Sequence, residues 1–83
     1  MKYPDEKEVF KQFGERIVEL RGKHKLSQSA LAGKAEIEKS SVQRLEKGSN
    51  VTLKTMIQLA NAFDITLTEL IELNNNEKTI EKK

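Results

Sequence analysis

One pattern occurs four times between Leu26 and Leu70 and strongly restricts how the chain can fold. In each occurrence an apolar residue precedes a potential helix cap, and a second apolar residue follows five positions after the first. This spacing is the hydrophobic staple, which marks the start of an α-helix. The four occurrences are Leu26 with Leu31 around Ser27, Ile37 with Val42 around Glu38, Val51 with Met56 around Thr52, and Ile65 with Leu70 around Thr66. The sequence therefore predicts four short helices in succession, and Glu69 adds a capping box to the last one.

A longer helix is expected before the first staple, from about Asp5 to Lys23. Its apolar residues recur at helical spacing with charged residues between them, and they are Phe10, Phe13, Ile17 and Leu20. The fourth helix carries a similar stripe, made of Leu53, Met56, Ile57, Ala60 and Phe63. No segment shows the alternating pattern of a strand. We predict an all-α fold, a compact bundle of five short helices.

The chain has 83 residues, and we expect a single domain over residues 1–73. Residues 74–83, NNNEKTIEKK, are too polar to join a core and are expected to form a disordered tail. A domain this small buries a modest fraction of its surface and is marginally stable unless its helices are well capped or it oligomerises. Dimerisation is therefore expected.

Several classes of protein are disfavoured by the composition. The chain has no cysteine, and its one histidine, His24, has no clear partner for metal binding or base catalysis. No nucleophilic site or phosphate-binding glycine loop is present in the sequence. We expect neither an enzyme nor a metal or cofactor site. No stretch approaches the roughly 20 apolar residues of a membrane span, so a cytoplasmic protein without membrane contact is expected.

Charge is distributed unevenly along the chain. Residues 21–54 carry eight basic and three acidic side chains, whereas residues 1–20 and 55–83 each carry more acidic than basic ones. A basic middle between acidic ends is typical of a segment that faces phosphates, although charge runs are more often solvated surfaces.

Residues 26–48, LSQSALAGKAEIEKSSVQRLEKG, predict a short helix, a tight connection and a second short helix that ends at Gly48. Polar residues crowd the start of the second helix, as they do in helices that enter the major groove of DNA. The stretch resembles the Cro and phage-repressor type of helix-turn-helix, the XRE-like family, and the resemblance extends from about Phe13 to about Ile71. It implies a lambda-repressor-like bundle that binds double-stranded DNA and regulates transcription.

Side chains near the start of the second helix of this motif reach base edges. Here we expect base readout by Lys39, Ser40, Gln43 and Arg44. Gln43 and Arg44 are the leading candidates because glutamine can pair with adenine and arginine with guanine, each through two hydrogen bonds. Lys39 is equally suited to a phosphate, Arg44 can reach either group, and Ser40 can instead bond at the helix start.

Phosphate contacts are expected on both sides of that helix. Gln28 follows the Ser27 cap, where free backbone N–H groups and the helix dipole favour a phosphate. The resemblance implies that Gln28 contacts the DNA backbone and braces the recognition helix. In the loop after Gly48, the residues expected beside phosphates are Ser49, Asn50, Thr52 and Lys54.

The resemblance also covers positions that shape the motif. It implies a partly buried ion pair between Arg21 and Glu46 that fixes helix orientation. Relatives usually have glycine where this chain has Glu36, so the turn either differs or is strained. Glu38 replaces the commoner serine or threonine cap and places negative charge near DNA. Gly33, inside a predicted helix, is expected to permit close packing.

Dimer contacts are expected from the end of the fourth helix and from the fifth. The candidates are Phe63, Ile65, Leu67, Ile71 and Leu73, of which some must instead be core, and Leu73 is the best placed. We predict a homodimer that binds an inverted repeat with half-sites roughly 10 bp apart and acts as a repressor. The ending of the motif resembles both phage-type repressors and restriction-modification controller proteins. The alternative is a protein-interaction module, such as an antitoxin that binds a protein partner through the tail.

Overall fold

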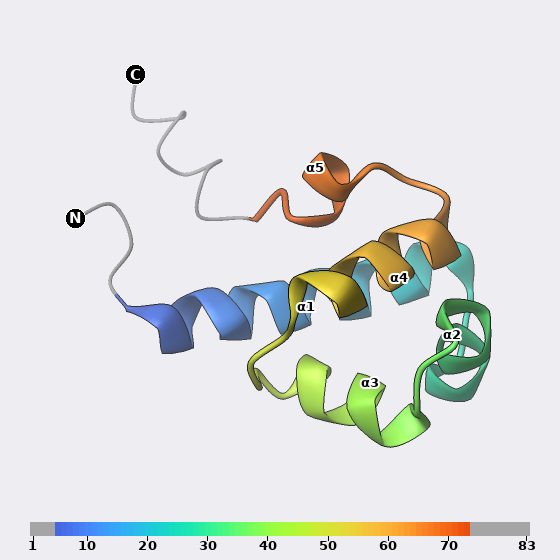
Figure 1. Ribbon diagram of the computed structural model, residues 1–83, viewed down its shortest axis with the longest axis horizontal. Helices are drawn as coiled ribbons and strands as arrows, with labels where there is room; N and C mark the ends of the chain where they lie inside the picture. The colour runs from blue at the N-terminus through green and yellow to red at the C-terminus, as the bar shows by residue number, and fades with distance from the viewer. Residues whose placement is uncertain (1–4, 74–83) are drawn as a thin grey trace.

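The computed structural model describes residues 5–73, which contain five helices and no strand. The helices are α1 (Glu6–His24), α2 (Gln28–Ala35), α3 (Lys39–Glu46), α4 (Leu53–Phe63) and α5 (Leu67–Leu70). Figure 1 shows α1 and α4 running along the length of the molecule, with α3 below them and α5 above them in this view. The all-α, five-helix prediction is confirmed, and α1 lies one residue later than expected at both ends. The prediction for the tail concerns residues 74–83, outside the described range.

The four staples correctly locate the starts of α2 to α5. Ser27, Thr52 and Thr66 are N-cap residues, and each side chain accepts a hydrogen bond from the backbone N–H three residues later. Thr66 and Glu69 form the predicted capping box. Glu38 is the N-cap of α3, but its side chain accepts no bond from the helix. α3 therefore begins without an interaction that is typically worth about 1 kcal/mol.

Three helices end at a residue with positive φ that is not glycine. Lys25, Glu36 and Asp64 have φ values of 55°, 61° and 58° and close α1, α2 and α4. The turn between α2 and α3 thus keeps the left-handed conformation that glycine adopts readily, and Glu36 takes it at a steric cost. Of the two alternatives predicted from the sequence, a different turn or a strained one, the structure has the strained turn.

The core is apolar and receives side chains from every helix. The second apolar residues of three staples, Leu31, Val42 and Leu70, are completely buried. α3 packs against α1 and α2, and α4 packs against α2 and α5. The helix-turn-helix is therefore supported on two sides by the rest of the bundle.

Two of the residues expected at a dimer interface lie in this core instead. Phe63 and Leu73 are 1% and 8% exposed, so their side chains offer almost no surface to a partner. Ile65 and Leu67 are half-buried against the core, and Ile71 is 41% exposed. The periodicity of the sequence could not distinguish core residues from interface residues. Both kinds of apolar residue recur at the same helical spacing along the chain.

Glycines play opposite roles in α1 and α2. A Cβ atom at Gly14 would lie 2.5 Å from the carbonyl oxygen of Leu45 and 2.9 Å from that of Glu46, so the absence of a side chain lets α1 approach the end of α3. A Cβ at Gly33 would meet nothing within 4 Å. The expectation that Gly33 permits close packing is wrong, and Gly14 is the residue that does so.

Candidate nucleic-acid interface

α3 presents two sharply different faces. Val42 and Leu45 are buried beneath it, whereas Lys39, Ser40 and Gln43 are exposed on its outer side. Among residues 5–73, no side-chain hydrogen bond involves these three exposed residues. We call Lys39, Ser40 and Gln43 the recognition face. Its polar groups are available to a ligand without breaking an interaction in the protein.

Arg44 lies beside the recognition face, but its side chain bonds to Ser41 on α3 itself. Its Nη2 donates a hydrogen bond of 3.4 Å to Ser41 Oγ. The same side chain lines a polar hollow of about 150 Å³ together with Asn50, Thr52 and Thr55 from the loop and the start of α4. Arg44 thus lines the same hollow as the segment expected to meet phosphates, which favours the phosphate alternative for Arg44.

The loop between α3 and α4 displays the other expected phosphate contacts. Ser49, Asn50, Thr52 and Lys54 are all exposed. The loop begins at Gly48, which has φ of 100°, and a Cβ there would lie 3.4 Å from the Cα of Lys11 in α1. The structure thus adds the exposed Lys11 to the charges near the loop. No local sequence signal could identify Lys11, because the approach depends on how α1 packs.

A hydrogen-bonded network joins the first three helices beneath the interface. Arg21 Nε and Nη2 donate to the two carboxylate oxygens of Glu46 at 2.6 and 3.1 Å, which confirms the expected ion pair. Gln28 Nε2 donates to Glu46 Oε1 at 2.9 Å, and Arg21 Nη1 donates to the carbonyl of Leu26 at 3.0 Å. Gln28 thereby connects α2 to the recognition helix, while its contact with DNA stays a prediction.

The electrostatics of this network reflect its partial burial. The Glu46 side chain is 8% exposed and that of Arg21 is 21% exposed. Hydrogen bonding to Glu46, reinforced by the opposite charge, raises the pKa of the Arg21 guanidinium despite its desolvation. Such a pair adds little net stability compared with apolar packing, but removal of one partner is costly. The pair joins α1 to α3, and its role in fixing the angle between them stays a prediction.

Comparison with known proteins agrees with this arrangement. A family model described as helix-turn-helix matches residues 17–70, which include all of α2, α3, α4 and α5. The chain belongs to the helix-turn-helix family. The resemblance to its Cro and phage-repressor type is thereby confirmed.

Two relatives of this helix-turn-helix chain extend the comparison. The restriction-modification controller protein C.AhdI from Aeromonas hydrophila superposes with a TM-score of 0.71 and 40% identity, covering 74% of this chain and 94% of its own. A Pyrococcus abyssi protein, assigned by name to the HTH-type transcriptional regulatory proteins, is 41% identical over 61 residues. That match covers 72% of this chain and 19% of the Pyrococcus protein.

Other kinds of site find no support in the described residues. Across residues 5–73, no three histidine or acidic residues gather as metal ligands would. Within the same range, no helix combines the length and apolarity needed to cross a membrane.

Proposed function

We propose that this DNA-binding regulator recognises a specific operator by inserting α3 into the major groove, and that it acts as a binding protein and not as an enzyme. The observation that carries the proposal is the recognition face, three exposed polar side chains on a helix of the helix-turn-helix family. Arg21, Glu46 and Gln28 bond to one another beneath this helix, which supports a preorganised orientation of its backbone. A helix that is already held in its binding orientation loses less entropy on binding, which favours affinity.

The phosphate contacts divide into two groups on either side of α3. Gln28 is on α2, while Ser49, Asn50, Thr52 and Lys54 follow α3, and Arg44 leans toward this second group. Contacts on both flanks would fix the helix in the groove without contributing sequence preference. Gln28→Ala should weaken binding to all sequences similarly, and a loss confined to one base position would contradict its phosphate role.

The regulator acts as a homodimer on an inverted repeat. Three exposed apolar side chains, two on α4 and one directly after α5, support this, and we call Leu53, Ile57 and Ile71 the dimer face. These residues are 58%, 46% and 41% exposed. Leu53 and Ile57 belong to the apolar stripe of α4, yet the bundle does not bury them. Leu53 and Ile57 are one turn apart on the same side of the helix. A second copy is the occupant that would cover this face and repeat the recognition helix for a second half-site.

Repression by steric exclusion of RNA polymerase is the simplest consequence of occupying a promoter, and we include it in the proposal. The similarity to C.AhdI, a restriction-modification controller protein, makes control of a restriction-modification system the favoured context among those that the sequence allowed.

Selection from randomised duplex DNA at physiological salt tests the central claim, since non-specific attraction is weakened there. Purified protein should enrich an inverted repeat with two equivalent half-sites. Gln43→Ala should relax preference at one position in each half-site, with about 1–3 kcal/mol less discrimination. The matched control, Asn61→Ala, removes an exposed amide from α4 and should leave the preference unchanged. Folded protein that enriches no sequence would contradict the proposal.

A further inference from the structure

The short helix α5 is held at its C-terminal end by a side chain from α1. Arg16 Nη2 donates to the carbonyl oxygen of Glu69 at 2.6 Å, and Arg16 Nε donates to that of Leu70 at 3.3 Å. The last carbonyls of a helix have no partner within the helix. The Glu69 carbonyl accepts a long bond of 3.4 Å from the Glu72 backbone N–H, and Arg16 adds a shorter bond there and a bond to the Leu70 carbonyl. The Arg16 side chain is 15% exposed, and its remaining contact is with Glu19 at 3.2 Å.

The two hydrogen bonds matter because α5 has four residues, Leu67–Leu70. A helix of one turn does not persist on its own and depends on tertiary contacts. The capping box of Thr66 and Glu69 secures its N-terminal end, and the buried Leu70 packs it onto the core. Arg16 secures the other end, from which the chain leaves toward the dimer face.

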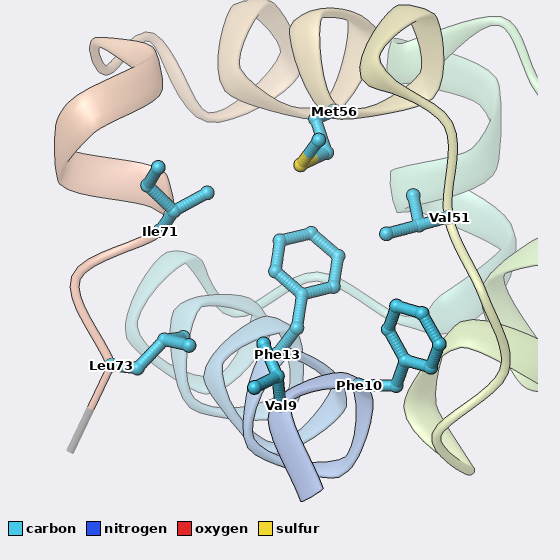
Figure 2. Close-up of a pocket in the computed structure, with 7 residues that line it drawn as sticks. All are labelled: Val9, Phe10, Phe13, Val51, Met56, Ile71 and Leu73. Atoms are coloured by element: carbon cyan, nitrogen blue, oxygen red, sulfur yellow. The ribbon is translucent and has the colours of Figure 1, made fainter. Parts of the chain in front are cut away.

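The residues that follow α5 form one side of an apolar groove. Figure 2 shows Ile71 and Leu73 facing Phe13 and Val9 of α1, with Met56 of α4 above them. The groove encloses about 300 Å³. Ile71 belongs both to this groove and to the dimer face, and it comes directly after the carbonyl group of Leu70 that Arg16 binds. The position of Ile71 relative to Leu53 and Ile57 therefore depends on where Arg16 holds the end of α5.

We propose that Arg16 is a positioning residue for dimerisation, fixing α5 so that Ile71 completes the dimer face. This inference rests on the proposed homodimer. A two-fold interface uses the same patch on both subunits, so any displacement of Ile71 is repeated in the partner and costs twice. The network of Arg21, Glu46 and Gln28 is separate from these contacts, so α3 keeps its orientation when Arg16 is changed.

The test compares wild type with Arg16→Gln, Arg16→Lys and Glu19→Gln by sedimentation equilibrium of the full chain. Arg16→Gln should raise the dimer dissociation constant about tenfold, because each subunit loses charge-assisted hydrogen bonds to two carbonyls. Arg16→Lys keeps the charge and the aliphatic stem but lacks the planar fork, so it should weaken the dimer too. Glu19→Gln removes the ion pairs of Glu19 with Arg16 and Lys23 but leaves the bonds from Arg16 to α5, so it should match wild type.

A second measurement separates this role from a general loss of structure. Binding to a duplex with one half-site, at protein concentrations below the dimer dissociation constant, should change less than about twofold in the Arg16 variants, since α3 is held elsewhere. Equal loss of half-site binding would show general damage and overturn the inference. Dimer affinity within threefold of wild type in both Arg16 variants would also overturn it. Wild-type protein that stays monomeric at all concentrations would instead refute the homodimer on which the inference rests.

Discussion

At the scale of single residues, backbone geometry is set by a few positions where side-chain size decides the outcome. Gly14 lies where α1 meets the last carbonyls of α3, and Glu36 lies in the turn that joins the two helices of the motif. There is no room for a Cβ atom at position 14, and glycine is present there. At position 36, glycine would relieve the strain that glutamate has at positive φ. They therefore predict stability changes of opposite sign.

Gly14→Ala should destabilise the protein by about 3 kcal/mol, because a Cβ 2.5 Å from the Leu45 carbonyl forces α1 and α3 apart. The matched control is Gly22→Ala in the same helix. A Cβ at Gly22 meets nothing within 4 Å, so alanine should stabilise α1 by about 0.5–1 kcal/mol. Urea unfolding of both variants measures the difference, and similar free energies would show that the helices can separate without cost.

Glu36→Gly should stabilise the protein by about 0.5–1 kcal/mol, the net of relieved strain at φ of 61° and the greater freedom of glycine in the unfolded chain. Glu36→Gln provides the control, since it removes the same charge but keeps the steric cost. The two variants should therefore differ in chemical denaturation. Equal stabilities would assign any effect of glycine to charge and not to the backbone.

At the scale of elements, α5 is the helix that depends most on its ends, and one of those ends is sensitive to pH. Hydrogen bonds from the Thr66 backbone N–H and hydroxyl to the Glu69 carboxylate lower the pKa of Glu69 below its ordinary value of 4.5. The folded state therefore binds a proton less readily than the unfolded state. The stabilisation is fully present above pH 4.5 and is lost as the pH falls through the lower folded-state value.

Glu69→Gln should consequently be less stable than wild type at neutral pH, and the difference should vanish on acidification below the folded-state pKa. The measurement is the free energy of unfolding between pH 2.5 and 7 for both proteins. Glu72→Gln, which removes an exposed carboxylate outside the capping box, serves as the control. A difference between wild type and Glu69→Gln that persists at low pH would show that the ionised carboxylate does not carry the effect.

The helices themselves could be predicted from the sequence because their start signals are local. Ser27, Thr52 and Thr66 lie within three residues of the N–H groups they bind, so residue spacing alone reveals them. The contacts of Arg16 with α5 join residues 53 and 54 positions apart, and no local pattern indicates them. Likewise, the stripe of α4 predicts an apolar side without telling whether this chain or another covers it.

At the scale of the whole molecule, the surfaces proposed for DNA contact and for dimerisation differ in charge and polarity. The recognition face lies on α3 in the basic middle of the chain, whereas Ile57 and Ile71 of the proposed dimer face lie outside that middle, on α4 and directly after α5. Leu53, the third residue of the dimer face, lies between Thr52 and Lys54 of the expected phosphate contacts. Substitutions at Ile57 or Ile71 should therefore disturb the proposed assembly without removing a side chain that is expected to contact DNA. The proposed homodimer would also link stability to protein concentration, since dimerisation favours the folded state by mass action.

Ile57→Glu should abolish dimerisation, because it places two like charges close together in a two-fold interface that excludes water. Val18→Glu is the matched control, since Val18 is equally exposed at 45% but lies on α1 outside the dimer face. For Ile57→Glu alone, sedimentation velocity should show a monomer. The midpoint of its thermal unfolding should also stay constant over a hundredfold range of protein concentration. Dimers of unchanged affinity would place the interface elsewhere.

The two faces of α3 have a consequence for how such a regulator can acquire new targets. Val42 and Leu45 carry the folding contribution of the helix, whereas Lys39, Ser40 and Gln43 make no side-chain bond to the rest of residues 5–73. Substitutions at these three positions would therefore be nearly free of folding cost. The scaffold can be kept while its operator is rewritten, so that duplicated copies of one gene could diverge to control different promoters through a few codon changes.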